Sequence, residues 1–499
     1  MHEDAADYAT AHRKPLLLAL AAILGVAAYF ALTMTGLAPP ARAVAGLTAT
    51  MALLWITEAI PIPVTSLLPM ALLPVLNVMP IHAAAAPYGN EIVFLFLGGF
   101  MLQLALERWH LHKRIALAIL AHAGTRPARL VGAVMLVTAF LSMWMSNAAT
   151  TALMLPIAAS LCHSVDHGAG EHSHAAKRFG TAIMLGIAYA ATLGGLMTPI
   201  GTAPNLILRE NLAQFDLVDI TFFRWMLVAV PVGLVTLVFA WWLLTHVLHP
   251  LNKLDVPIDS QGIMRSRREL GPLSRGEIAT IAVFAFMICG WLFREPLCDW
   301  LGMVTVKGAK REYWLTDPGI AIIGGIALFC IPVDRRSGTF ALDWSLASRI
   351  PWGVLLLFGG GLALAEAFVV TGIDKQVGEL VGRLQGVHPI VVVLAVAAAS
   401  VFLSEIASNT ALTAMMLPVL RATAGGLGIP AATLLWPATF GASMAFMLPA
   451  GTPPNAIVFG SGRVTVKQMA RAGIALNLFS IAIITLAAWL GAAKVLVGQ

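Results

Sequence analysis

Long apolar runs dominate the chain, and short polar segments separate them. Five of these runs, at 15–35, 42–60, 221–246, 278–292 and 474–490, contain almost no charged residues. A helix of about 20 apolar residues crosses the roughly 30 Å hydrocarbon core of a bilayer, where backbone polar groups must pair within the segment. The pattern predicts an all-α polytopic membrane protein with about eleven transmembrane helices.

Two polar motifs occur twice in matching apolar surroundings. FLSMWMSNAATTALMLP at 140–156 matches FLSEIASNTALTAMMLP at 402–418 at 11 of 17 positions. LMTPIGTAPN at 196–205 matches FMLPAGTPPN at 446–455 at 6 of 10 positions. An odd number of crossings between the copies gives the two halves opposite orientations. This is the inverted-repeat plan of secondary transporters, with broken helices that meet near the middle of the membrane.

The repeats set the expected organisation of the chain. We expect N-terminal scaffold helices at 1–85, a first inverted repeat at 86–250, a cytoplasmic loop at 251–276 and a second inverted repeat at 277–499. Within the repeats we expect re-entrant hairpins at 126–162 and 388–423, and broken helices at 178–210 and 430–461. If both hairpins are re-entrant, most Lys and Arg residues lie on the same side of the membrane as the N-terminus. By the positive-inside rule, this side is the cytoplasm. If both hairpins crossed completely, the basic loop would stay inside only with a flipped N-terminus.

Composition supports the membrane assignment. Of the 499 residues, 59% are hydrophobic and 11% are charged, and the mean hydropathy is +0.84, which excludes an ordinary soluble domain. The net charge of +6 does not indicate a nucleic-acid partner, because in a membrane protein the positions of the basic residues matter more than their sum. The first apolar run lacks a cleavage site, so we expect it to be retained. The four cysteines have neither metal-site nor disulfide spacing, and we interpret them as packing residues.

The repeated Ser-Asn pairs, Ser146-Asn147 and Ser408-Asn409, lie where the hairpins must reverse direction. Backbone groups freed at such a reversal are tolerated inside a membrane only if they line a cavity or bind something. Hard cations such as Na⁺ prefer neutral and anionic oxygens. A single Ser or Asn in a membrane helix more often bonds to a neighbouring helix. Duplication in two matched contexts favours a binding site.

The segments 201–205 and 451–455 combine Gly, Thr, Pro and Asn, which interrupt a helix. Each interruption exposes carbonyl groups of one half-helix and N–H groups of the other, so it can hold cations and anions without a charged side chain. Lys and Arg are absent from all four motifs. A dianion bound there needs co-bound cations, which predicts coupling between an anion and Na⁺.

Other polar residues are weaker candidates. Glu405 lies inside the second hairpin opposite Met143 of the first copy, and it either braces the hairpin or acts near an ion. Glu58 is expected to end a helix as a buried capping partner. Four histidines belong to a polar stretch that we interpret as a solvated loop and not as a metal site: His163, His167, His172 and His174.

The chain resembles the divalent anion:sodium symporter family, in its dicarboxylate and citrate branch, over nearly its whole length. The resemblance depends on WITEAIPIPVTSLLP at 55–69, the two Ser-Asn tips and MLPAGTPPNAIVFGSG at 447–462. It implies eleven transmembrane helices, two re-entrant hairpins, two broken helices and a homodimer in the plasma membrane, the inner membrane of a bacterium. It also implies Na⁺ as the coupling ion and an elevator movement of the hairpin-bearing domain.

The resemblance also implies site residues. The first sodium site would use Ser142, Ser146, Asn147 and Gly201, and the second Ser404, Ala407, Asn409 and Gly451. The substrate carboxylates would meet Ser146, Asn147, Ser408, Asn409, Thr410, Thr452 and Pro453. One departure concerns the substrate: Ala148 replaces the usual Thr of the first tip, which removes a hydroxyl unless Thr150 substitutes for it.

These observations predict a secondary active transporter that couples Na⁺ to the import of C4-dicarboxylates such as succinate, malate or fumarate. The alternatives are a sodium-independent dicarboxylate or citrate exchanger of the same fold and, further away, a passive anion channel. An enzyme is not expected, because the chain has no HExxH motif and no nucleophile with a plausible base. The preferred anion and the Na⁺ stoichiometry stay open.

Overall fold

A computed structural model describes the chain except residues 1, 123, 125, 170–173, 217–218, 252–267, 308–309, 383–386 and 499. Helices make up most of the described part, and its four strands form two short antiparallel pairs. Most of the cytoplasmic loop expected at 251–276 lies outside the described residues.

Among the described residues, eight helical segments are long and apolar enough to cross a membrane: Lys14–Ala31, Ile81–Arg108, Asn147–Asp166, His174–Leu196, Phe222–Leu248, Arg275–Leu292, Trp352–Thr371 and Val466–Trp489. Four shorter apolar segments accompany them: Ile62–Val75, Pro127–Ser142, Asp317–Cys330 and Pro389–Leu403. The predicted all-α membrane fold is confirmed. The expected total of about eleven crossings stays a prediction.

The chain forms two compact units that alternate along the sequence. Unit 1 comprises Met1–Val93, Ile207–Val218 and Pro351–Ala442. Unit 2 comprises Phe94–Leu206, Asp219–Ile350 and Ser443–Gln499. The repeats expected from the sequence divide the chain by internal symmetry, whereas these units divide it by contacts. The expected repeat boundaries therefore stay predictions.

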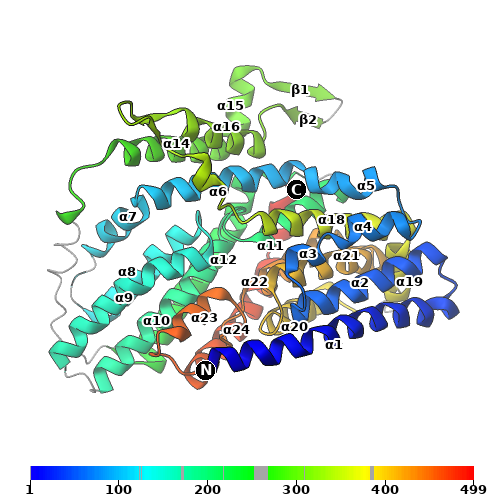
Figure 1. Ribbon diagram of the computed structural model, residues 1–499, viewed down its shortest axis with the longest axis horizontal. Helices are drawn as coiled ribbons and strands as arrows, with labels where there is room; N and C mark the ends of the chain where they lie inside the picture. Colours follow the sequence, from blue (N-terminus) through cyan, green and yellow to red (C-terminus); the bar gives the residue numbers. More distant parts are fainter. Residues whose placement is uncertain are drawn as a thin grey trace. The chain divides into compact units, whose positions relative to one another are not determined.

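Unit 1 begins with α1 (His2–Ala31), the 3-10 turn η1 (Leu32–Thr35) and α2 (Pro39–Thr57). The helices α1 and α2 lie side by side (Figure 1), and the Thr50 hydroxyl of α2 donates to the Ala21 carbonyl of α1 at 3.2 Å. Helix α2 ends at Glu58, whose left-handed φ of 48° stops the helix before Pro61. Glu58 is exposed, so the expectation of a buried capping partner is wrong.

The motif at 55–69 surrounds Ser66 with hydrogen bonds. It folds into α3 (Ile62–Thr65) and the start of α4 (Leu68–Val75). The Trp55 indole donates to the Ser66 hydroxyl at 3.3 Å, and the Tyr88 hydroxyl donates to the Ser66 carbonyl at 2.5 Å. These bonds tie the motif to the 3-10 turn η2 (Ala86–Gly89), which follows α5 (Ile81–Ala85).

The rest of unit 1 is helical. It contains α18 (Trp352–Thr371), α19 (Ile373–Gly382), α20 (Pro389–Leu403), α21 (Asn409–Leu427), most of α22 (Ala432–Ser443) and most of α11 (Ala203–Asp216). Helix α20, the turn at 404–408 and α21 form a helical hairpin in the segment expected at 388–423. Its re-entrant course in a membrane stays a prediction.

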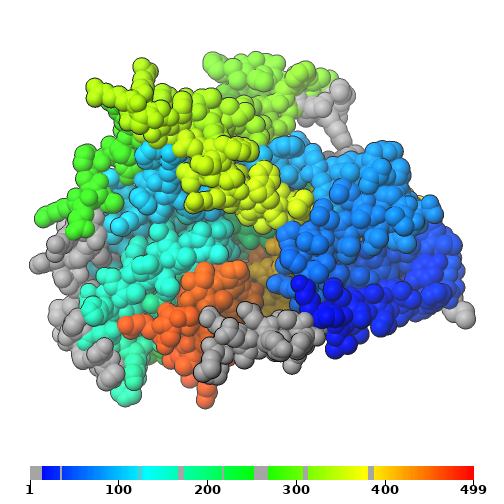
Figure 2. Space-filling view, viewed as in Figure 1, coloured from blue at the N-terminus to red at the C-terminus, as the bar shows by residue number. Residues whose placement is uncertain are grey.

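The central helix of unit 2 is α10 (His174–Leu196), which is buried along almost all of its length. Helices α8 (Pro127–Ser142) and α9 (Asn147–Ala169) form the first hairpin and pack against α10 (Figure 1). The short helix α23 (Pro453–Gly460) contacts α9 and α10, and Figure 2 shows its orange surface against the cyan surface of α9. Segments from both sequence repeats therefore meet within unit 2.

The remaining elements of unit 2 are α6 (Glu91–Arg108), α7 (Leu111–Leu120), α12 (Phe222–Trp242) with the π-helical turn η3 (Leu243–Leu248), α14 (Arg275–Leu292), α15 (Arg294–Leu301), β1 (Val304–Lys307), β2 (Lys310–Tyr313), α16 (Asp317–Cys330), β3 (Pro332–Asp334), β4 (Thr339–Phe340), α17 (Trp344–Ala347), α24 (Val466–Trp489) and α25 (Ala492–Val497). An ion-pair network centred on the buried Arg294 side chain joins three of them. The Arg294 guanidinium contacts the carboxylates of Asp219 at 2.7 Å and Asp317 at 3.3 Å. The Phe222 N–H donates to Asp317 at 3.0 Å, which fixes the start of α12 against α15 and α16.

Candidate functional site

The first hairpin reverses direction at 143–146, between α8 and α9. The Ser142 hydroxyl donates to the Asn147 side-chain oxygen at 2.8 Å, and the Thr151 hydroxyl donates to the Asn147 carbonyl at 2.7 Å. The Ser146 hydroxyl oxygen accepts the Ala149 N–H at 3.3 Å, as a helix N-cap does. Three predicted site residues therefore also form the tip of the hairpin.

The first broken helix is interrupted at 197–202, between α10 and α11. The side-chain amide of Asn205 donates to the carbonyls of Gly195 at 3.0 Å, Leu196 at 3.4 Å and Thr198 at 2.7 Å. The Gly195 and Leu196 carbonyls lose their helical partners because α10 ends at Leu196, and the Thr198 carbonyl lies within the break. The Thr198 hydroxyl in turn donates to the Met143 carbonyl at 2.5 Å, which joins the break to the hairpin tip.

Close backbone approach brings the first tip and the first break together. A Cβ atom on Gly195 would collide with the Asn147 side-chain oxygen, and a Cβ atom on Gly201 would collide with the Gly195 backbone. Only glycine permits this approach. Ser142, Asn147 and Gly201, all expected at the first sodium site, thus lie in one connected set of contacts within unit 2, with Ser146 beside Asn147. Their role as ion ligands stays a prediction.

The second break repeats this geometry between α22 and α23. The side-chain amide of Asn455 donates to the carbonyls of Ala445 at 3.3 Å and Leu448 at 3.0 Å. These carbonyls lie 10 and 7 residues before Asn455, the same separations as those of Gly195 and Thr198 from Asn205. The similarity of the two sequence segments therefore corresponds to a shared local structure.

The tip of the second hairpin is only partly similar to that of the first. The Thr413 hydroxyl donates to the Asn409 carbonyl at 2.8 Å, as Thr151 does to Asn147, and the Ser404 hydroxyl donates to the Val401 carbonyl at 2.8 Å. The Asn409 side-chain oxygen is buried and has no hydrogen-bond partner in the described part of the chain. A buried polar atom without a partner is costly, and an amide oxygen in this state suits a cation.

The predicted residues divide between the two units. Ser404, Ala407, Ser408, Asn409 and Thr410 belong to unit 1, whereas Gly451, Thr452 and Pro453 belong to unit 2. The second sodium site and the full set of substrate contacts therefore stay predictions. Within unit 2, the Thr452 hydroxyl is buried and has no hydrogen-bond partner among the described residues, and the same holds for Thr150 of the first hairpin.

Sequence reasoning missed several residues at the tips and breaks. The Gln103 side-chain oxygen accepts the Ser146 N–H at 3.2 Å. Asn205 and Asn455 hold the breaks through their side-chain amides, and their place in the repeated motif was the available signal. Thr198 has no counterpart hydroxyl in the second motif, where Leu448 occupies the position, so the repeat could not reveal it.

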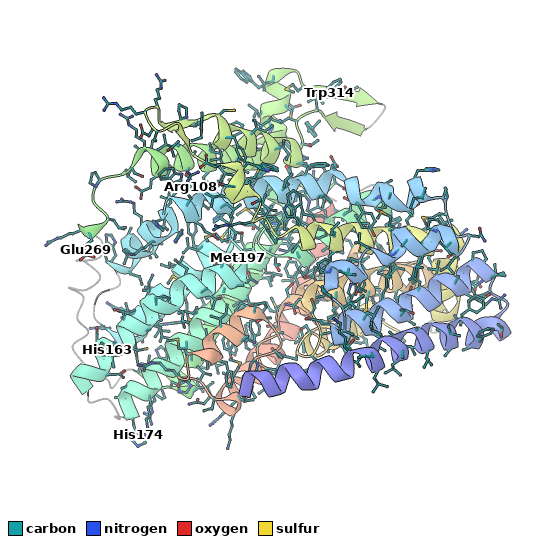
Figure 3. The ribbon with its side chains drawn as sticks, in the orientation of Figure 1. Arg108, His163, His174, Met197, Glu269 and Trp314 are labelled. Atoms are coloured by element: carbon teal, nitrogen blue, oxygen red, sulfur yellow. The ribbon has the colours of Figure 1, made fainter. Side chains whose placement is uncertain are left out.

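The weaker candidates lie apart from these contacts or stay open. Glu405 is buried in the second hairpin, and its role stays a prediction. Figure 3 shows His163 near the end of α9 and His174 at the start of α10, away from Met197 at the start of the first break. Both histidines are exposed but helical, so the interpretation of this stretch as a loop is wrong for these two residues. The His167 side chain and His172 lie outside the described residues. Where the structure is described, no group of three or more His, Cys, Asp or Glu residues could hold a metal ion.

All four cysteines are free. Cys162 and Cys298 are buried, as expected of packing residues. Cys289 and Cys330 are exposed, so the interpretation as packing residues is wrong for these two.

Long apolar helices, two hairpins with Ser-Asn tips and two broken helices define a polytopic membrane transporter. The sequence model of the family described as "Sodium:sulfate symporter transmembrane region" matches residues 11–496. The chain belongs to this family, the divalent anion:sodium symporters, and is an integral protein of the plasma membrane.

Similar proteins and structures support this assignment. The chain is 39% identical to the sodium-dependent dicarboxylate transporter SdcS of Staphylococcus saprophyticus over 436 residues. The matched segment covers 87% of this chain and 82% of the relative. The same identity and coverage hold for SdcS of Staphylococcus aureus strain USA300. The fold is similar to that of the Alcanivorax borkumensis YdaH transporter, with a TM-score of 0.52, 15% identity and coverage of 81% of this chain and 85% of that one. It is also similar to that of Neisseria gonorrhoeae MtrF, with a TM-score of 0.55, 12% identity and coverage of 82% and 81%.

Proposed function

We propose that this protein is a sodium-coupled symporter that imports C4-dicarboxylates such as succinate, malate and fumarate across a bacterial inner membrane. The observation that carries the proposal is the 39% identity, over 87% of the chain, to proteins described as sodium-dependent dicarboxylate transporters. The family description adds sodium coupling with a divalent anion. The tips and breaks are polar and contain no Lys or Arg, which suits both cargoes.

In this proposal Na⁺ is held by neutral oxygens. Ser142, Ser146, Asn147 and Gly201 hold the first ion, and Ser404, Ala407, Asn409 and Gly451 hold the second. Hydroxyl, amide and carbonyl oxygens are the ligands that a hard monovalent cation prefers. The buried Asn409 oxygen without a protein partner supports this assignment, because an ion would satisfy it.

The substrate carboxylates bind to hydroxyls, amides and helix N-termini in the proposal. The residues are Ser146, Asn147, Ser408, Asn409, Thr410, Thr452 and Pro453. Helices α9 and α21 begin at or beside these residues and offer first-turn N–H groups to an anion. Helix α23 begins with Pro453 and Pro454, which have no N–H, so Asn455 is its first possible backbone donor. No Lys or Arg occurs in the tips or breaks, so co-bound Na⁺ supplies the neutralising charge. Each cargo then raises the affinity for the other, which is the basis of coupling.

The hairpins and broken helices move in this proposal as part of an elevator. Two copies form a homodimer whose scaffold stays fixed, while the hairpin-bearing domain carries both cargoes across the membrane. Because no Lys or Arg occurs in the tips and breaks, the binding site without substrate presents no basic side chain to the apolar region.

The test is uptake of radiolabelled succinate into proteoliposomes that contain the purified protein. An inward Na⁺ gradient is compared with a matched K⁺ gradient, in empty vesicles and in vesicles preloaded with succinate. The proposal expects concentrative uptake that requires Na⁺ and does not require preloading. Uptake that occurs only into preloaded vesicles and ignores Na⁺ would establish an exchanger instead. Competition by malate, fumarate, citrate and sulfate then ranks the anions.

A further inference from the structure

One face of α6 contacts both parts of the first candidate sodium site. Gly99, Gln103 and Glu107 are spaced by four residues and therefore lie on the same side of the helix. Gly99 faces Ile200, because a Cβ atom on Gly99 would lie at an ordinary van der Waals distance of 3.7 Å from the Ile200 Cδ1 atom. Ile200 precedes Gly201 in the first break. Gln103 contacts Ser146 at the tip of the first hairpin. All of these residues belong to unit 2.

Gln103 links Glu107 to the hairpin tip through its two amide atoms. Its Nε2 donates to the Glu107 carboxylate at 2.9 Å, and its Oε1 accepts the Ser146 N–H at 3.2 Å. The carboxylate accepts only, so it fixes which end of the Gln103 amide faces Ser146. Ser146 caps α9, and its N–H lies outside the helical hydrogen bonds. The tip is thus held by a group from outside the hairpin.

The second repeat lacks this arrangement. When the two repeats are aligned at their hairpin tips, Gly361 corresponds to Gly99. Ala365 and Val369 then occupy the positions of Gln103 and Glu107. Packing of this helix therefore does not require a Gln-Glu pair. At the hairpin tips it is the first repeat that lacks a polar side chain, because it has Ala148 where the second repeat has Thr410. The half that lacks a tip hydroxyl is the half with the additional glutamine.

We propose that Gln103, oriented by Glu107, is a positioning residue of the transport site that compensates for the hydroxyl missing at Ala148. By accepting the Ser146 N–H, it holds Ser146 and Asn147 in the geometry that binds Na⁺ and a substrate carboxylate. The inference depends on the proposed sodium-coupled transport. It adds a residue of α6 to a site otherwise formed by the hairpins and the breaks.

The test compares Gln103→Leu with Gln214→Leu in the proteoliposome assay. Gln214 is a matched control: its Nε2 donates to the Glu366 carboxylate at 2.7 Å, in unit 1, so the same substitution also removes a Gln-Glu bond. Loss of one hydrogen bond to the tip should raise the Na⁺ concentration for half-maximal uptake and the succinate KM by roughly 2- to 12-fold, with a smaller change in Vmax. The control should leave both constants at the wild-type values.

Two further variants separate positioning from folding. Glu107→Gln supplies donors as well as an acceptor, so it no longer fixes the orientation of the Gln103 amide and should raise both constants in part, whereas Glu107→Leu removes the acceptor and should raise them further. Gln103→Leu combined with Ala148→Thr should recover part of the lost affinity, because the added hydroxyl replaces the missing support. Recovery by a substitution on a different element would not follow from a general packing defect.

The outcomes distinguish this inference from the proposed function. If wild-type uptake ignores Na⁺, the proposed function fails, and the inference fails with it. If wild-type uptake needs Na⁺ and Gln103→Leu keeps both constants, only the inference is wrong. The inference is also wrong if Gln103→Leu changes only Vmax and leaves both constants unchanged. It is wrong, too, if Gln103→Leu acts only by lowering the yield of folded protein, measured by size-exclusion chromatography, as much as Gln214→Leu does.

Discussion

Asn205 is the residue whose removal should most directly disturb the first break. It is fully buried, and its side-chain amide donates to two carbonyls at the end of α10 and to the Thr198 carbonyl in the break. Two of these bonds, at 3.0 and 2.7 Å, have good length, and the third at 3.4 Å is long. Asn205→Ala leaves these carbonyls without that donor beside Gly201 and the tip residue Asn147.

The magnitude follows from the number of bonds. A hydrogen bond contributes about 0.5 to 1.5 kcal/mol net, so losing the two good ones costs about 1 to 3 kcal/mol. If the whole cost falls on the conformation that binds Na⁺, the apparent sodium affinity drops by roughly 5- to 150-fold. Asn205→Asp should be worse than Asn205→Ala, because it keeps the shape but turns an acceptor toward the carbonyls.

The assay is the Na⁺ dependence of succinate uptake, together with the Tm of the purified protein with and without Na⁺. Thr192→Ala is the control, because Thr192 is buried in α10, whose end Asn205 contacts, but its hydroxyl donates at 3.1 Å to the Ala188 carbonyl one turn earlier. Asn455→Ala should resemble Asn205→Ala with a smaller effect, since its two bonds are longer. Wild-type sodium affinity and Tm in Asn205→Ala would refute the reasoning, as would an equal effect of Thr192→Ala.

Four other predictions follow. Asn409→Ala should abolish uptake and its Na⁺ dependence, and near-normal transport in vesicles would remove Asn409 from the second sodium site. Ala148→Thr should change the KM of at least one of succinate, citrate and sulfate, whereas unchanged values for all three would place residue 148 outside the substrate contacts. Arg294→Met leaves Asp317 buried without its guanidinium partner, so it should destabilise the protein by about 3 kcal/mol and lower the Tm; an unchanged Tm would contradict this. Burial and two nearby guanidinium groups lower the pKa of His249, which lies just beyond the end of η3, to about 4. The folded protein therefore favours the neutral imidazole, and the Tm should fall as the pH drops from 6.5 toward 4. His249→Gln should reduce this fall, and a pH profile identical to that of the wild type would contradict the assignment.

The local structure of the tips and breaks follows closely from the sequence. Gly, Pro and Asn restrict the backbone within a few residues, so interruptions at 197–202 and 444–452 could be placed from the residue types alone. The duplication also indicated which interruptions are related, and the matching bonds of Asn205 and Asn455 are consistent with that relation. The resemblance to the family depends on the same short segments.

Contacts between distant segments could not be predicted in this way. Gln103 lies 43 residues before Ser146, and a single glutamine in an apolar helix gives no local signal of its partner. Cys289 and Cys330 were misassigned for the same reason, since a hydrophobic pattern identifies a helix but not which of its faces is covered. The strands β1 and β2 also went unpredicted. They form an antiparallel pair, with Val304 opposite Tyr313, in a short polar connection without a strong alternating pattern.

The two tips differ in a way that bears on sodium binding. In the first, the Asn147 side-chain oxygen already accepts the Ser142 hydroxyl at 2.8 Å, whereas the Asn409 oxygen in the second has no hydrogen-bond partner within the described residues. A cation that uses both Ser142 and Asn147 oxygens must first turn the Ser142 proton away, which costs one hydrogen bond. A cation at Asn409 breaks no such bond. On the proposed function, the second site therefore binds Na⁺ more tightly than the first, so Asn147→Ala should leave measurable uptake at high Na⁺ concentration, whereas Asn409→Ala leaves none.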